Sequence, residues 1–287
     1  MSAYLLFDGV LHEQVLPWLY RQDEPLEIEP LYMYTPWSEL ADIGPVLVQP
    51  FSADGLLRNF ERDPTLHRCA SMLLSVAPIC ELAEHLRQFV RVTDVWGSES
   101  LLRFADPLVA QHWLASYSEQ ALAAVLGPID EWKLAAHSPR WQTRAQTQWV
   151  CFHARKPGAS QASLKLHHFE RPQIDGLEQA YQCRFSDQLD SWFEQAHSGF
   201  RSTMGSAWGD WLGRQLQAAR AWGLTTERSI AIWLELHARL GDQLCDDEGK
   251  LYTAWLAENP HLQGMPADTR IQAFEADYFN RQPQGLS

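Results

Sequence analysis

Lysine is scarce in this 287-residue chain, which has only four lysines among its 23 basic side chains. The arginines are scattered along the sequence, and 36 acidic residues bring the net charge to −13. Nucleic-acid binding draws on clustered lysine and arginine side chains that neutralise phosphates. The composition therefore excludes a basic nucleic-acid-binding surface, while 46% hydrophobic residues are enough to form a buried core.

Long apolar segments are also lacking. The first apolar run, Tyr4 to Phe7, has no basic flank and stops at Asp8, so it does not predict a secretory signal. No other window approaches the ~18 uninterrupted apolar residues of a membrane-spanning helix. The five cysteines are odd in number and form no Cys-x-x-Cys pair, which is typical of free thiols in a reducing compartment. We therefore expect a cytoplasmic protein that does not insert into a membrane.

Motifs for catalysis are missing as well. No glycine-rich run precedes a Lys-Ser or Lys-Thr pair, and Ser206 lacks the Gly-x-Ser-x-Gly spacing of a nucleophile elbow. The adjacent His167 and His168 would point to opposite faces of a strand. Cys151 and His153 are spaced to share one strand face, but no second ligand pair follows. We predict no catalytic residue, metal site or cofactor; a hydrolase using Cys151 and His153, or a carboxylate site, stays as the alternative.

The first half of the chain combines the patterns of short strands and short helices. A helical stripe of apolar residues follows Pro78, and Asp106-Pro107 and Ser118 are suited to begin two further helices. Apolar and polar residues alternate around Gly97, which predicts a β-hairpin between residues 89 and 104. We expect a loop over 23–30 and strands at 4–7, 31–34, 46–48, 72–76, 132–135 and 148–153.

The second half has a purely helical pattern. Apolar residues recur at helical spacing over 177–196 and 208–222 and from Ile230 up to Gly241, with shorter stretches at 251–256 and 269–279. Thr225 or Thr226 is suited to cap the third of these helices. Small and polar residues between Lys156 and Gln161 are typical of a linker. We predict a mixed α/β (α+β) domain over 1–156, a connecting segment over 157–175 and an all-α domain over 176–287.

Five short sequence phrases in the first half occur in the order found in a known family. Together they resemble the adaptor chaperone family of bacterial type VI secretion over roughly residues 1–155, although Ala105 stands where the family more often has an aromatic residue. A shorter and less specific likeness covers residues 219–227. The phrases are Tyr4-Leu5-Leu6-Phe7-Asp8-Gly9, Leu40-Ala41-Asp42-Ile43-Gly44-Pro45-Val46-Leu47-Val48, Glu81-Leu82-Ala83-Glu84-His85-Leu86-Arg87, Arg103-Phe104-Ala105-Asp106-Pro107 and Gly127-Pro128-Ile129.

The resemblance implies a cytoplasmic chaperone that binds a type VI secretion effector and delivers it to the VgrG or PAAR spike protein. It brings no activity, cofactor or catalytic residue with it. An immunity protein, which would bind the toxic domain of the effector instead of its delivery region, is a further alternative. The effector segment is expected to be apolar or amphipathic, lying in a groove.

Thirteen tryptophans are available for such contacts, because tryptophan buries a large area and is enriched in binding hot spots. Most of them are expected to fill the cores, and Trp96, beside Gly97 at the hairpin tip, is the best candidate for exposure. We predict a partner-binding site at Trp96, with His85, Arg87 and Arg103 as polar neighbours. Residues 1–150 contain 19 acidic and 10 basic side chains, a balance of −9 that suits either a basic client or simple solubility.

Overall fold

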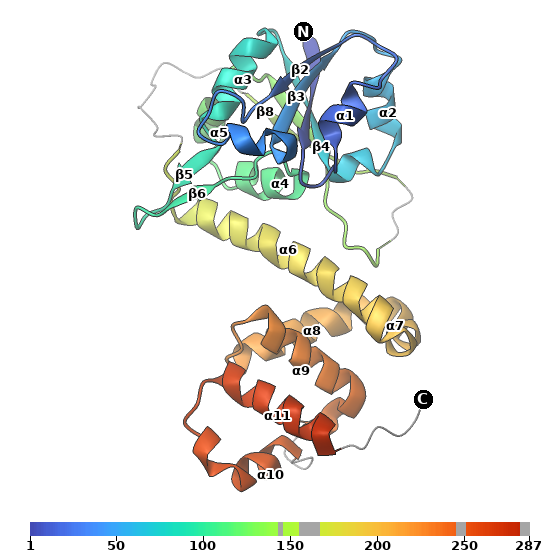
Figure 1. Ribbon diagram of the computed structural model, residues 1–287, viewed down its shortest axis with the longest axis vertical. Coiled ribbons are helices and arrows are strands. Elements are labelled where there is room, and N and C mark those ends of the chain that lie inside the picture. Colours follow the sequence, from blue (N-terminus) through green and yellow to red (C-terminus); the bar gives the residue numbers. More distant parts are fainter. Residues whose placement is uncertain (143–145, 155–166, 245–250, 282–287) are drawn as a thin grey trace. The chain divides into compact units, whose positions relative to one another are not determined.

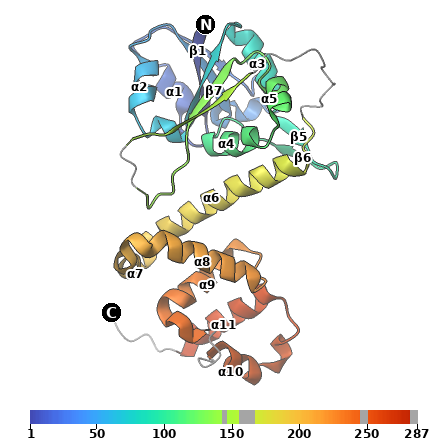
Figure 2. The same cartoon turned by 180° about the vertical axis from the view of Figure 1, so that it is seen from behind.

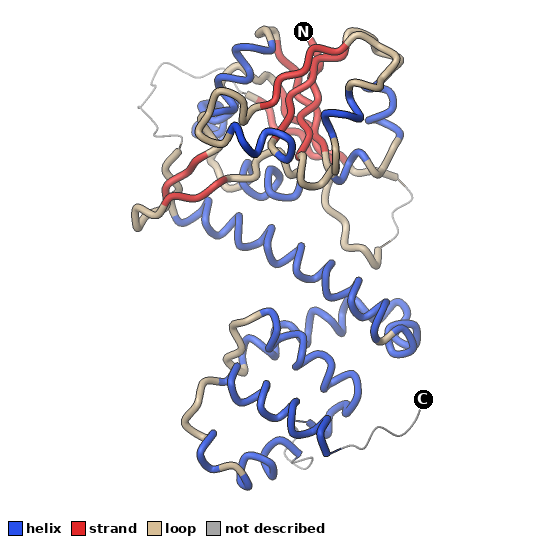
Figure 3. Tube along the Cα trace, viewed as in Figure 1, coloured by secondary structure: helices blue, strands red, loops and turns tan. Residues whose placement is uncertain are grey.

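The computed structural model describes residues 1–142, 146–154, 167–244 and 251–281. The chain divides into two compact units. The first comprises Met1–Ser138 and Gln142–Cys183, and the second comprises Pro139–Trp141 and Arg184–Ser287. The first contains strands and helices, whereas the described part of the second contains helices without strands (Figure 3). The predicted fold class, α+β followed by all-α, is confirmed.

A six-stranded sheet forms the centre of the first unit, with the order β2-β3-β1-β4-β7-β8 and antiparallel pairing throughout. β1 and β4 are far apart in sequence but pair side by side, with Tyr4 opposite Leu73. The strands are β1 (Ser2–Asp8), β2 (Leu26–Pro30), β3 (Pro45–Pro50), β4 (Ala70–Ser75), β7 (Glu131–Ala135) and β8 (Trp149–His153).

Helices cover both faces of this sheet (Figures 1 and 2). Side chains alternate between the two faces of a strand, so Tyr4 and Leu6 enter one apolar core and Leu5 and Phe7 enter the other. This double burial explains why β1 is continuously apolar instead of alternating. The core around Tyr4 is covered by α3 (Ile79–Arg87), α4 (Pro107–Ala115) and α5 (Glu119–Leu126); the other is covered by α1 (Val15–Leu19) and α2 (Leu56–Arg62).

Two helix starts have the predicted caps. The Asp106 carboxylate accepts a hydrogen bond from the Leu108 backbone at 3.1 Å and caps α4, whose first residue is a proline. The Ser118 hydroxyl accepts one from the Ala121 backbone at 3.3 Å and caps α5. The predicted hairpin is also confirmed, as β5 (Arg91–Thr93) paired with β6 (Glu99–Leu101).

The expected loop over 23–30 and strand over 31–34 are wrong. Residues 26–30 form β2, and residues 31–34 form a turn. Among the described strands, β2 pairs with β3 alone and lies at the edge of the sheet, where acidic side chains reach water and Pro30 needs no outward hydrogen bond. Helix α2 was not predicted.

The second unit is a set of helices around its own core, centred on Phe193, Trp208 and Leu234. Its third long helix, α9 (Glu227–Leu240), is capped by Thr226, whose hydroxyl accepts a hydrogen bond from the Ser229 backbone at 3.3 Å. Helix α6 (Arg171–Ala196) begins inside the segment 157–175 and contributes residues to both units. The other helices are α7 (Ser198–Met204), α8 (Trp208–Ala221), α9 (Glu227–Leu240), α10 (Leu251–Glu258) and α11 (Ala267–Arg281). Among the described helices, none is both long and apolar enough to cross a membrane.

Candidate protein-binding surface

The β5–β6 hairpin carries exposed apolar side chains at its tip and on its second strand. Trp96 is 72% exposed and is the most exposed tryptophan of the chain, which confirms the expected exposure. The turn is held by the Asp94 carboxylate, which accepts hydrogen bonds from the Trp96 and Ser98 backbones at 2.9 and 2.8 Å. Gly97 takes the left-handed backbone conformation that the turn requires. A pinned turn thus presents Trp96 to solvent, with Val95 and Leu101 exposed beside it.

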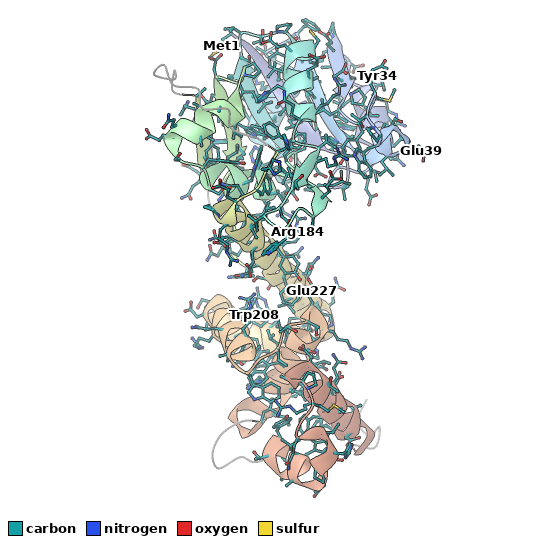
Figure 4. All side chains as sticks on the ribbon, turned by 90° about the vertical axis from the view of Figure 1, so that its left-hand side faces the viewer. Met1, Tyr34, Glu39, Arg184, Trp208 and Glu227 are labelled. Atoms are coloured by element: carbon teal, nitrogen blue, oxygen red, sulfur yellow. The ribbon has the colours of Figure 1, made fainter. Side chains whose placement is uncertain are left out.

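A second exposed apolar group lies on the loop over residues 31–44, which joins β2 to β3. Leu31 and Tyr32 are buried, whereas Tyr34 is 90% exposed and has a positive φ of 63°. Such a backbone conformation is uncommon for a residue other than glycine and is typical of functional loops. Met33, Leu40 and Ile43 are exposed on the same loop. Tyr34 and Glu39 lie on the same side of the domain in Figure 4.

Arg87, one of the predicted binding residues, holds this loop in place. Its Nε donates a hydrogen bond to the Leu31 carbonyl at 3.2 Å, and its Nη2 forms an ion pair with the Glu29 carboxylate. Only 19% of the Arg87 side chain and 30% of the Glu29 side chain are exposed. Arg87 therefore fixes the start of the loop against α3.

Arg103 is paired in a similar way. Its Nη2 donates to both carboxylate oxygens of Asp8 at 2.9 and 3.0 Å and lies 3.7 Å from Asp106. The same Asp8 carboxylate accepts from the Val10 and Leu11 backbones and so orders the turn after β1. Arg103 thus connects the end of β1 with the beginning of α4.

His85 faces inward from α3. Its Nε2 donates to the Val125 carbonyl of α5 at 2.8 Å, and its ring packs edge-on against Phe89. Burial lowers the pKa of His85 below its usual range. A Cβ atom on Gly127 would come within 2.4 Å of the ring, so this close approach requires glycine. His85 thus links α3 to α5, and its burial favours the neutral form.

All five sequence phrases that carry the family resemblance meet in these contacts. Gly9 donates to the Gly44 carbonyl at 3.2 Å, and a Cβ on Gly44 would come within 2.6 Å of the Tyr32 ring. These two contacts, together with those of Asp8 with Arg103, Arg87 with Leu31 and His85 with Gly127, hold the loop over 31–44 and its neighbours in place. The residues of the five phrases therefore form internal contacts that support the exposed side chains.

A cleft of about 490 Å³ separates this loop from the hairpin. Its lining includes Trp37 and its neighbours from the loop, Arg91, Thr93 and Glu99 of the hairpin, and His167 and His168. Arg87 also reaches the cleft. Arg91 and Glu99 form an ion pair at 3.2 Å across the hairpin, with both side chains more than half exposed. The volume is in the range that accommodates part of a peptide or a small ligand.

Of the predicted binding residues, Arg87 lines the cleft, and Trp96 lies at the tip of the hairpin whose strands line it. His85 and Arg103 take part in internal contacts next to it. The exposure of Tyr34 was not predicted. Tyr34 takes a left-handed backbone conformation in a turn, and no glycine in the sequence indicates a turn of that kind there.

The residues considered for catalysis do not form a reactive group in the described part of the chain. Partial burial of its sulfur, with Glu131 nearby, raises the pKa of Cys151, which is the opposite of what a thiolate nucleophile needs. His153 lies 3.7 Å from Glu131. The rings of His167 and His168 are 4.8 Å apart and do not point to opposite faces, because these residues lie outside a regular strand. Within the described residues, no three potential metal ligands gather.

Comparison with known proteins shows what the first part of the chain is similar to. Residues 3–124 match the family model described as "Domain of unknown function (DUF4123)". The "Accessory protein VasW" of Vibrio cholerae serotype O1 (strain ATCC 39315 / El Tor Inaba N16961) is 30% identical over 103 residues, which cover 36% of this chain and 34% of that protein. The match thus spans about a third of the relative's length. No solved structure matches the chain. The match over residues 3–124 and the likeness to VasW support the resemblance to the effector-associated chaperone family of type VI secretion.

Proposed function

We propose that this protein is a cytoplasmic adaptor that binds a type VI secretion effector and helps to load it onto the VgrG or PAAR spike, without catalysing a reaction. The observation that carries the proposal is the pair of exposed aromatic side chains, Tyr34 and Trp96, on the loop and the hairpin that border the cleft. Aromatic side chains supply much of the energy of protein interfaces. The DUF4123 match and the likeness to an accessory protein support the same function.

The surroundings of the loop suit a basic effector segment. Residues 22–57 contain seven acidic residues and neither lysine nor arginine. Glu39 and Asp42 are exposed and alternate with the exposed Leu40 and Ile43 on the short 3-10 helix η1 (Ser38–Ile43). An amphipathic segment with basic flanks would match both the apolar side chains and the negative charge.

Co-purification with the toxin encoded beside this protein tests the proposal. Tagged protein should retain the toxin. Deletion of the adaptor gene should reduce the solubility and secretion of the toxin, whereas deletion of a gene that has no role in secretion should leave both unchanged. An unretained toxin with unchanged solubility and secretion in the deletion strain refutes the proposal.

Mapping the bound toxin fragment separates an adaptor from an immunity protein. We expect the delivery region of the toxin to bind and the isolated toxic domain to be left free. Binding of the toxic domain alone, with loss of its toxicity, would assign the immunity function instead.

A further inference from the structure

The outer edge of β6 exposes backbone groups that can extend the hairpin by another strand. Within the hairpin, Asp94 donates to the Ser98 carbonyl at 3.0 Å and Leu102 donates to the Val90 carbonyl at 3.2 Å. Antiparallel pairs alternate between hydrogen-bonded and non-hydrogen-bonded positions, so Val92 and Ser100 also face each other as a bonded pair. The backbone N–H and C=O groups of Glu99 and Leu101 consequently point away from β5.

The outward groups of β5 show how such an edge is used. Thr93 is the partner of Glu99 in the register, and its backbone groups point outward on the opposite side. Thr93 donates to the His167 carbonyl and accepts from the Phe169 backbone, both at 2.8 Å. The segment 167–169 therefore occupies the β5 edge.

The corresponding edge of β6 has no such neighbour within the described residues. No backbone hydrogen bond there joins Glu99 or Leu101 to a segment outside the hairpin. All three residues of β6 are exposed. The unoccupied groups are two N–H donors and two C=O acceptors in alternation, a pattern that an extended polypeptide satisfies.

The side chains beside this edge indicate what the added strand would carry. Arg91, Thr93 and Glu99 line the cleft, and Leu101 shares their face because it is the partner of Arg91 in the register. Every second side chain of an added strand would lie on this face next to Glu99 and Leu101. A basic residue beside Glu99 and an apolar residue beside Leu101, two positions apart, would give favourable lateral pairs. The balance of −9 over residues 1–150 favours the same basic character.

We propose that β6 binds an extended segment of the effector by strand addition, with a basic and an apolar side chain of that segment two residues apart on the cleft face. This inference rests on the proposed adaptor function and specifies how the effector binds. The edge is only three residues long and carries a charged side chain, which limits uncontrolled pairing of long strands.

Two substitutions at Leu101 separate the backbone from the side chain. Leu101→Pro removes the outward N–H, and the bonds between β5 and β6 remain because they use Val92 and Ser100. Leu101→Ala removes the apolar side chain and keeps the N–H, so it is the matched control. In titrations of the full chain with the co-purified effector, we expect Leu101→Pro to weaken binding at least tenfold more than Leu101→Ala. Equal affinities of the two variants would overturn strand addition.

Hydrogen exchange of the unmodified protein provides a measurement that does not depend on the folding of a variant. The amides of Glu99 and Leu101 should exchange at least tenfold more slowly in the effector complex than in the free protein. Unchanged exchange at both amides would overturn the proposal. Protection of these amides in the free protein that increases with protein concentration would also overturn it, because a second copy of the chain would then occupy the edge. An effector that does not bind the unmodified protein at all contradicts the adaptor function itself, and strand addition with it.

Discussion

Replacing Arg87 by alanine should loosen the loop over 31–44 without unfolding the domain. The change removes the hydrogen bond to the Leu31 carbonyl and the ion pair with Glu29. A hydrogen bond to a charged group contributes about 1.5–3 kcal/mol, and Glu29, 30% exposed, recovers part of its solvation when its partner is lost. We therefore expect local destabilisation of about 2 kcal/mol, which is roughly a 30-fold change in an equilibrium constant.

Hydrogen exchange followed by mass spectrometry measures this directly. Amides of the loop, such as Met33 and Thr35, are protected by hydrogen bonds to the Pro30 and Tyr32 carbonyls. Their exchange should accelerate by about 30-fold in Arg87→Ala. Arg87→Lys should have an intermediate effect, because an ammonium group cannot reach both acceptors with a fork of N–H groups.

The control is Arg62→Ala, at an exposed position at the end of α2. It should leave the exchange of the loop unchanged, as surface substitutions usually alter stability by less than about 0.5 kcal/mol. Unchanged loop exchange in Arg87→Ala would refute the positioning role. If effector binding were lost in that variant nonetheless, Arg87 would contact the effector instead.

Three further predictions concern stability. Trp113→Ala should destabilise the first unit by about 3–5 kcal/mol in urea unfolding, since Trp113 is fully buried among aromatic rings; no loss would contradict the packing. Desolvation raises the pKa of Asp268, but hydrogen bonds from Thr226 and Thr225 outweigh it and bring this pKa well below its ordinary value. The contribution of Asp268 to folding stability should therefore be present above pH ~4 and be lost on acidification. Asp268→Ala should cost about 1–2 kcal/mol at pH 7 and show a flatter acid dependence than the unmodified protein; a parallel dependence would contradict this assignment. Burial lowers the pKa of His85, so its contribution to folding stability should be present above the unfolded-state pKa of ~6.5 and be lost as the pH falls. His85→Gln should lose less stability than the unmodified protein between pH ~7.5 and ~5. The same shift of the urea midpoint over this pH range in both proteins would contradict this prediction.

Local signals in the sequence were enough to predict most of the elements. The apolar run within β1, the caps at Asp106, Ser118 and Thr226, and the glycine at the hairpin tip each depend on a few neighbouring residues. The exposure of Trp96 followed from the hairpin turn in the same way.

Contacts between distant residues could not be read from local patterns. β2 has the composition of a loop, and only its pairing with β3 makes it a strand. Arg87 and Glu29 are separated by 58 residues, so their ion pair follows from the position of the edge strand against α3. The interpretation of Arg87 and Arg103 as binding residues therefore stays a prediction, whereas their partners within the domain are now identified.

Exposed aromatic side chains around the cleft are the basis of the proposed function, and a matched set of variants tests their contribution. Phe51 is a suitable control because it is 63% exposed and follows β3 at the end opposite to the 31–44 loop. Its replacement by alanine removes an exposed aromatic side chain from the same domain at a position that does not line the cleft.

The most direct test is the dissociation constant of the complex with the neighbouring toxin, measured by calorimetric titration for the unmodified protein, Tyr34→Ala/Trp96→Ala and Phe51→Ala. Hot-spot aromatic residues contribute about 2 kcal/mol or more, so the double variant should bind at least about 30-fold more weakly. Phe51→Ala should bind within about threefold of the unmodified protein, as expected for an aromatic residue outside the interface. Equal dissociation constants for all three proteins would contradict an effector-binding surface at the loop and the hairpin.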